Sequence, residues 1–382
     1  MKFHFFLPAV FLCLLMAGCR TNIQTEARKQ SPFACVDSFD FQQHSYTMYG
    51  QAEMKYTFSK KGNMNFQKWQ TEFRAELKEK IGLSKIERQL KGYKPKAVQI
   101  DSEDIGYALR QRWIIWTEPT VPLPFVLMLP KGQKGKAPLM ITPHGHSKNT
   151  ESYAGIYLNE EDRISGEEGE RNVAVQAAQE GFIAIAPTAR GFGTTRSKQD
   201  IASDEMRSDH TLLLHDLLAG RTPIGDRVWD ISKLIDWALE NLAVDETKII
   251  VSGNSGGGTA TLFAGACDTR IAASAPSSYF NTFSGSLGTF RHCDCNYVPG
   301  ILDLGEMWDV AGLTAPRYFC AIHGIKDKSF PIDQTRIAFK NLQEIYKAAG
   351  VPENCELYEG SEGHRYYKQG AWNFIHKYIQ KQ

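Results

Sequence analysis

Residues 248–259 read KIIVSGNSGGGT, and this stretch decides the fold. An apolar strand pattern runs into Gly-x-Ser-x-Gly and then into small residues that suit the start of a helix. Gly253 and Gly257 allow a sharp turn that would lift the hydroxyl of Ser255 above the edge of a sheet. The free N–H of Gly256, at the start of the helix, would face negative charge that develops there. The stretch therefore predicts a nucleophilic serine at a strand end.

Strand and helix patterns alternate on both sides of this turn. Apolar runs of strand length lie at residues 125–129, 139–142, 182–186, 249–252, 271–274, 318–322 and 356–358. Helical patterns lie at residues 171–180, 209–218, 228–242, 257–266 and 333–349. Helical apolar spacing over residues 66–81 adds a helix in front of the sheet. We expect one α/β catalytic domain over residues 61–382, with a mostly parallel central sheet, helices on both faces and an N-terminal helical extension.

A serine hydroxyl needs a base that takes its proton, and the base needs a carboxylate that orients it. These partners should follow later strands, in the order serine, acid, histidine. Asp327 lies in the loop after the strand pattern at residues 318–322, and His364 in the loop after residues 356–358. The rivals, which lie off the expected loop positions, are Asp333, Glu362 and His323. We expect Ser255, Asp327 and His364 to form the catalytic triad.

The loop after residues 139–142 reads Pro-His-Gly-His. Its glycine lets the backbone approach a reacting carbonyl, so the N–H of His146 is the expected oxyanion partner of the Gly256 N–H. The imidazoles of His144 and His146 are expected to pack and hydrogen-bond within the loop. Arg190, after the next strand, either binds a substrate carboxylate or holds its own loop in place.

Neither metal nor cofactor is expected. The pairs Asp209-His210 and His215-Asp216 share one helical stretch, but their spacing places the histidines on different faces. Cys293-Asp294-Cys295 has no second cysteine pair nearby, which disfavours zinc. Arg227 and Asp230 open a helix and are expected to be structural.

The N-terminus has the pattern of an export signal. A basic start precedes an apolar run that is too short to span a bilayer, over residues 1–18. Residues 15–19 read LMAGC and resemble the lipobox of bacterial lipoproteins, which implies lipidation of Cys19 and a membrane anchor. Residues 19–60 are polar and aperiodic, as expected for a lipid-anchored stalk and an arm. No acidic run follows Cys19, which favours the periplasm over the cell surface.

The composition limits the classes of binding partner that can be expected. Lys and Arg total 44 against 43 Asp and Glu, without a long run of one sign, so nothing indicates a nucleic-acid partner. An exported protein can keep disulfides, but their pairing and the oligomeric state stay open. The cysteines concerned are Cys35, Cys267, Cys293, Cys295, Cys320 and Cys355.

Four motifs carry a resemblance to known enzymes. They are PHGH at residues 143–146, ARGFG at 189–193, GNSGGG at 253–258 and HCDCNYVPG at 292–300. From about residue 60 onward the chain resembles the α/β-hydrolase superfamily, and within it the acetyl xylan esterase and dienelactone hydrolase-like groups. The resemblance implies a metal-independent carboxylesterase that removes acetyl groups from plant-type polysaccharides.

Three alternatives remain open at this point. One is a methyl esterase of uronic-acid esters, in which Arg190 would anchor a carboxylate. Another is a peptidase related to prolyl oligopeptidases, but no repeat pattern of a propeller is present and Asn254 departs from the usual peptidase motif. The third is a non-catalytic, glycan-binding lipoprotein that kept the scaffold.

Overall fold

The computed structural model describes residues 40–58, 65–147 and 149–380. These fall into two units, residues 1–50 and residues 51–382. The described part of the first unit is helix α2 (Phe41–Gly50), in a segment expected to be aperiodic. Ser45 and Thr47 donate their hydroxyls to carbonyl groups one turn earlier, so polar residues complete this helix without an apolar stripe. The predicted signal at residues 1–18, Cys19 and Cys35 lie outside the described residues.

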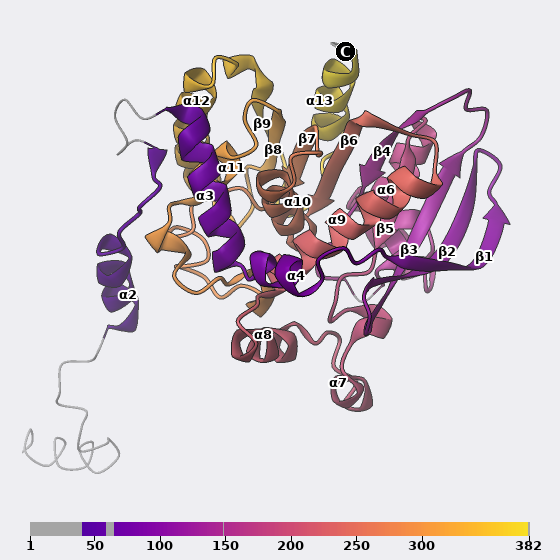
Figure 1. The fold of residues 1–382 in the computed structure, drawn as a ribbon, viewed down its shortest axis with the longest axis horizontal. Coiled ribbons are helices and arrows are strands. Elements are labelled where there is room, and N and C mark those ends of the chain that lie inside the picture. The colour runs from indigo at the N-terminus through magenta and orange to yellow at the C-terminus, as the bar shows by residue number, and fades with distance from the viewer. Residues whose placement is uncertain (1–39, 59–64, 148, 381–382) are drawn as a thin grey trace, which may run out of the picture. The chain divides into compact units, whose positions relative to one another are not determined.

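The second unit is built on a nine-stranded sheet (Figure 1) in the order β1-β2-β3-β5-β4-β6-β7-β8-β9. The strands are β1 (Lys96–Asp104), β2 (Ala108–Glu118), β3 (Val121–Pro130), β4 (Ala137–Ile141), β5 (Ile183–Pro187), β6 (Val244–Asn254), β7 (Ala273–Ser277), β8 (Tyr318–Gly324) and β9 (Cys355–Gly360). Strands β4 to β9 are parallel, while β1, β2 and β3 pair antiparallel at one side. The predicted α/β class with a mostly parallel sheet is confirmed, although β1 and β2 were not predicted.

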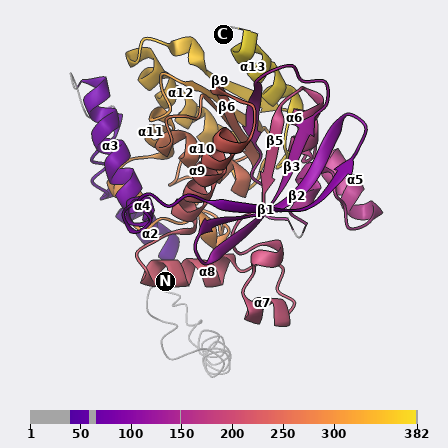
Figure 2. The same ribbon diagram turned by 45° about the vertical axis from the view of Figure 1, so that its right-hand side comes forward.

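Side chains alternate between two apolar layers along each central strand. In β6, Ile249 and Val251 belong to one buried cluster and Ile250 belongs to the other. Helices α6 (Val173–Gln179) and α13 (Lys368–Gln380) cover the face of Ile250. The opposite face carries α9 (Pro223–Asn241), α10 (Gly256–Cys267), α12 (Ile332–Ala348) and the predicted N-terminal helix α3 (Phe66–Lys80). Figures 1 and 2 show α9 and α10 side by side on that face.

Parallel strands end at one edge of a sheet, so the loops after β4, β5, β6, β8 and β9 gather there. The connection from β5 to α9 carries two helices, α7 (Lys198–Ala202) and α8 (Asp209–Leu218), which lie beyond an end of the sheet in Figures 1 and 2. Shorter helices complete the unit, namely α4 (Leu83–Gln89), α5 (Glu160–Glu168) and α11 (Met307–Gly312). Among the helices of the described residues, none has both the length and the apolar character needed to cross a membrane.

Candidate active site

Ser255 occupies a strained turn between β6 and α10. Its φ of 57° and ψ of −118° lie where side-chain-bearing residues rarely go, at a cost of about 1–3 kcal/mol. Its N–H donates to the Ser277 carbonyl over 2.9 Å. A Cβ on Gly253 would lie 2.3 Å from the Pro143 carbonyl oxygen, and one on Gly257 would lie 2.0 Å from it. Only glycine fits at both positions, so the motif builds the sharp strand-to-helix turn for which it was singled out.

Asp327 and His364, from the loops after β8 and β9, meet through a hydrogen bond. His364 Nδ1 donates to Asp327 Oδ2 over 2.7 Å. The other carboxylate oxygen accepts the N–H groups of Ser329 and Phe330, at 2.9 and 3.1 Å. Burial opposes ionisation of Asp327, but the bond and charge of His364 bring its pKa below the ordinary value. Because Asp327 holds Nδ1, Nε2 is the nitrogen left to accept a proton.

The end of β7 ties the serine turn to the histidine loop. The Ser277 carbonyl accepts the Ser255 N–H. The hydroxyls of Ser277 and Ser278 donate to the carbonyl of Arg365 at 3.3 and 3.0 Å. Arg365 directly follows His364, so Ser277 is bonded to both segments, and Ser278 adds a second bond to the histidine loop.

The loop after β4 packs onto the serine turn. A Cβ on Gly145 would lie 3.3 Å from Ser255 Cβ, and the Gly145 N–H donates to the Tyr153 hydroxyl over 3.0 Å. His144 Nδ1 donates to the Gly145 carbonyl at 2.6 Å, and Nε2 accepts the Ala189 N–H at 2.9 Å. Burial lowers the pKa of His144 to about 4, so the ring is neutral at pH 7. This ring braces the loop.

His146, the expected oxyanion donor, has a neutral and enclosed ring. Burial, and then the charges of Arg227 and Arg207, lower its pKa to about 2. Its Nε2 lies 3.1 Å from the sulfur of Cys295. A Cβ on Gly256 would lie 2.8 Å from its Cε1, so the two proposed oxyanion residues are neighbours.

Within the part of the chain that is described, one group of side chains has atoms placed for a metal ion. His146, Asp209 and Cys295 bring their ligand atoms within 4.8 Å of one another. Asp209 Oδ1 is already paired with Arg207 at 2.9 Å, and two guanidinium groups act on the His146 ring. These cations oppose a further positive charge. The three residues lie far apart in the sequence, in the loop after β4, at the start of α8 and in a short helical turn, so sequence spacing gave no sign of the group.

Arg227 was expected to be structural, yet it lies beside the serine turn. Its side chain is buried, and its Nε and Nη1 have no hydrogen-bond partner. The guanidinium stacks over the Phe192 ring at 5.7 Å. Its Nη1 would lie 3.7 Å from a Cβ on Gly256. A positive charge therefore sits close to the first N–H of α10.

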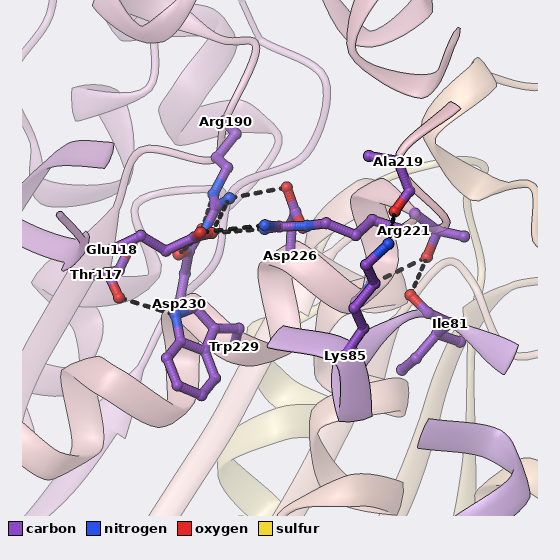
Figure 3. A network of polar contacts seen from close by, with 12 residues as sticks. Ile81, Lys85, Thr117, Glu118, Arg190, Ala219, Arg221, Asp226, Trp229 and Asp230 are labelled. Atoms are coloured by element: carbon purple, nitrogen blue, oxygen red, sulfur yellow. Dashed lines mark hydrogen bonds and ion pairs between the residues drawn. The ribbon is translucent and has the colours of Figure 1, made fainter. Parts of the chain in front are cut away.

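Arg190 lies in an internal ion network, shown in Figure 3. Its Nε and Nη2 donate to both oxygens of Asp230, at 2.9 and 2.7 Å. Its Nη1 lies 2.9 Å from Asp226 and 2.6 Å from Glu118. All three nitrogens face the protein's own carboxylates. Of the two roles open for Arg190, the geometry favours holding its loop over binding substrate.

The loop that carries residues 292–300 lies near His364. The ring of His292 lies 4.7 Å from that of Phe330, which stacks on His364 at 5.9 Å. Burial lowers the pKa of His292. Its buried Nε2 has no hydrogen-bond partner. In the described part of the chain the cysteines are free thiols, namely Cys267, Cys293, Cys295, Cys320 and Cys355.

With this geometry in place, comparison identifies the family. A model of the Abhydrolase family matches residues 40–283, more than half of the chain. The chain belongs to the Abhydrolase family. The match covers Ser255 and the loop after β4 but ends before Asp327 and His364, so the roles expected for these two residues have only the geometry described above as support.

Solved structures share the fold of this abhydrolase. A candidate acetyl xylan esterase of Bacteroides fragilis NCTC 9343 (BF1801) has a TM-score of 0.70 at 18% identity, covering 89% of this chain and 85% of that one. Methylesterase BT1017 has a TM-score of 0.63 at 19% identity, covering 88% and 68%. A CE15 glucuronoyl esterase of Teredinibacter turnerae T7901 has a TM-score of 0.61 at 16% identity, covering 92% and 93%. All three are less than 25% identical to this abhydrolase, and what they share with it is the fold.

Proposed function

We propose that this abhydrolase is a serine carboxylesterase that removes acetyl groups from plant-type polysaccharides, with Ser255, His364 and Asp327 as its triad. The observation that carries the proposal is the 2.7 Å bond between Asp327 and His364, tied through the end of β7 to a serine in a strained turn. A buried carboxylate that holds one imidazole nitrogen leaves the other to act as the base.

Hydrolysis proceeds in two steps. His364 Nε2 takes the Ser255 proton as the oxygen attacks the ester carbonyl, and Asp327 stabilises the imidazolium that forms. The N–H groups of Gly256 and His146 bind the oxyanion, and the imidazolium gives its proton to the departing alcohol. Water, activated by His364, then releases the acid from Ser255. No step requires a metal or a cofactor.

The carbohydrate substrate is supported by what the structural neighbours are said to hydrolyse. Their names include an acetyl xylan esterase, a methylesterase and a glucuronoyl esterase. Two of these names specify a sugar, xylan or a glucuronoyl group, and the third specifies only a methyl ester. The acetyl ester is the first candidate because the sequence motifs resemble that group, and the methyl ester of a uronic acid is the second.

Released acid and alcohol separate the two candidates. Purified protein is incubated with acetylated xylan and with methyl-esterified pectin, and acetate and methanol are measured. We expect acetate from xylan and little methanol from pectin. Methanol without acetate would replace the acetyl esterase with the methyl esterase, and neither product would refute both.

We also propose a lipid anchor at Cys19 that faces the periplasm. The support is the sequence pattern of residues 1–19, in which small residues precede the cysteine at the end of an apolar run. Protease treatment of intact cells tests the orientation, since a periplasmic protein survives it and a surface protein is cut.

A further inference from the structure

A large hollow lies near the proposed ester site. It has a volume of about 800 Å³, in the range of about 300–1,000 Å³ typical of ligand pockets. Its walls come from the turn between β2 and β3, the loop after β5, and helix α8. We call it the α8 groove.

The floor of the α8 groove is the ion network of Figure 3. Arg221 donates to both Glu118 and Asp226, and the latter also pairs with Arg190. Two arginines here face three carboxylates, the third being Asp230, so the floor is held rigidly and its charges largely compensate one another.

A carboxyl group without a partner adds to this floor. Asp216, on α8, is 8% exposed, and its Oδ2 has no hydrogen-bond partner. Buried polar oxygens rarely lack a donor, so each one that does calls for an explanation. A hydroxyl-rich ligand in the groove would bring such donors close to Asp216.

Two further cations, Arg196 and Lys198, stand in the walls. Arg196 donates to the carbonyl oxygens of Gly193 and Glu205, not to a carboxylate. Hydrogen bonds to hydroxyl groups, and then the charge of Arg196, lower the pKa of nearby Asp200, whereas the exposed Lys198 has no ion pair among the described residues. Hydroxyl groups stand among these cations, from Thr194, Ser197 and Thr211. The groove thus presents positive charge together with many hydrogen-bonding groups.

This chemistry distinguishes one kind of sugar from another. Phe, Tyr and Trp side chains, against which neutral sugar rings pack, are missing from the described residues that line the groove. Cations and hydroxyls instead match a sugar that carries a carboxylate.

The α8 groove adjoins the loop that supports the ester site, so one polysaccharide molecule could contact both. Gly191 lines the groove, and the next residue, Phe192, packs its ring against those of His144 and His146 at 5.2 and 5.3 Å. One loop therefore forms a wall of the groove and supports the proposed oxyanion loop.

We infer that the α8 groove binds a uronate-bearing stretch of the polysaccharide whose ester Ser255 cleaves. Arg196 and Lys198 pair with the uronate carboxylates, and the hydroxyl side chains bind the sugar hydroxyls. The inference rests on the proposed function, because it takes the substrate to be a glycan.

Calorimetric titration with tetragalacturonate tests the groove, and xylotetraose serves as the neutral probe. The key variant is Lys198→Glu, with Lys340→Glu as a matched control on an exposed position of α12. We expect tetragalacturonate to bind the parent and the control alike, and Lys198→Glu to bind at least 10-fold more weakly. A second variant, Thr211→Trp, fills the groove without changing charge and should also abolish binding.

Hydrolysis of p-nitrophenyl acetate separates the two proposals. This small ester does not need the groove, so both groove variants should keep the parental kcat/KM, which also shows that they fold. The inference about the groove would be overturned if Lys198→Glu bound tetragalacturonate as tightly as the parent does. It would also be overturned if the parent bound xylotetraose as tightly as tetragalacturonate. If the parent did not hydrolyse p-nitrophenyl acetate, the proposed esterase function would be overturned instead.

Discussion

Arg227 is a buried cation, and two of its side-chain nitrogens have no hydrogen-bond acceptor. A buried cation without a carboxylate costs stability, so its retention next to the serine turn needs another cause. The nearest one is Gly256, whose N–H is a proposed oxyanion donor. We infer that Arg227 strengthens the positive field at that N–H without touching substrate, since both unpartnered nitrogens are shielded from solvent.

Replacement of this arginine should therefore separate activity from stability. Arg227→Met is expected to lower kcat for p-nitrophenyl acetate about 10-fold, with KM little changed, because the field acts on the developing oxyanion. Its free energy of unfolding in urea should stay equal or rise by about 1 kcal/mol. Arg227→Lys, which keeps the charge, should recover part of kcat. A Met variant with parental kcat and lower stability would assign Arg227 a purely structural role.

At the scale of elements, the connection from β5 to α9 is held by the ion network around Arg190. Three carboxylates surround one guanidinium, of which Asp226 and Asp230 are buried and Glu118 is partly buried, and Arg221 supplies the second cation. Removal of one member would leave the others buried without compensation. The network fixes the start of α9 against β2, and with it one wall of the α8 groove.

Arg190→Ala tests whether this arginine holds the fold or binds substrate. We expect the free energy of unfolding, measured in urea, to fall by about 3–5 kcal/mol. Arg163→Ala, which removes an exposed arginine of α5 that also pairs with two carboxylates, should leave the unfolding midpoint unchanged. An Arg190→Ala variant with parental stability and a raised KM for a uronic ester would restore the substrate-binding role.

Asp216 gives helix α8 a pH-dependent contribution. Burial, and then the charge of Asp226, raise its pKa to about 7, against the opposing charges of Arg221 and Arg190. A carboxyl whose folded-state pKa is raised favours the folded state below its unfolded pKa near 4 and loses that contribution as pH rises through about 7. Asp216→Asn should therefore gain stability relative to the parent, by about 1–3 kcal/mol between pH 4 and pH 8. Urea unfolding of both proteins at these two pH values measures the difference, and a constant difference would contradict it.

For the whole molecule, the parallel part of the sheet could be predicted because its strands are apolar on both faces. Strand β6 shows this, since Ile249, Ile250 and Val251 are all fully buried. Strands β1 and β2 were not predicted because their patterns are weak. The edge strand β1 is mostly exposed and polar, and β2 contains the consecutive polar residues Arg110, Gln111 and Arg112 and is mostly partly buried. Tertiary pairing, not local pattern, makes them strands.

The same contrast holds for the site. Ser255, Asp327 and His364 could be named because each follows a strand whose carboxyl end reaches one edge, and order along the chain is informative there. The setting of Arg227 and the meeting of His146 with Asp209 and Cys295 could not be predicted. Those neighbours lie far apart in the sequence, and only the folded structure shows that two nitrogens of Arg227 lack a hydrogen-bond partner.

The most direct test of the account is the reaction of Ser255 itself. Parent and Ser255→Ala proteins are treated with a fluorophosphonate probe, and hydrolysis of p-nitrophenyl acetate is measured in parallel. We expect the probe to label the parent stoichiometrically and to leave the variant unlabelled, with a loss in kcat of at least about 10³-fold. A Ser255→Ala protein that hydrolyses the ester at the parental rate would contradict the nucleophile, and a parent that takes no label would favour a glycan-binding protein without catalysis.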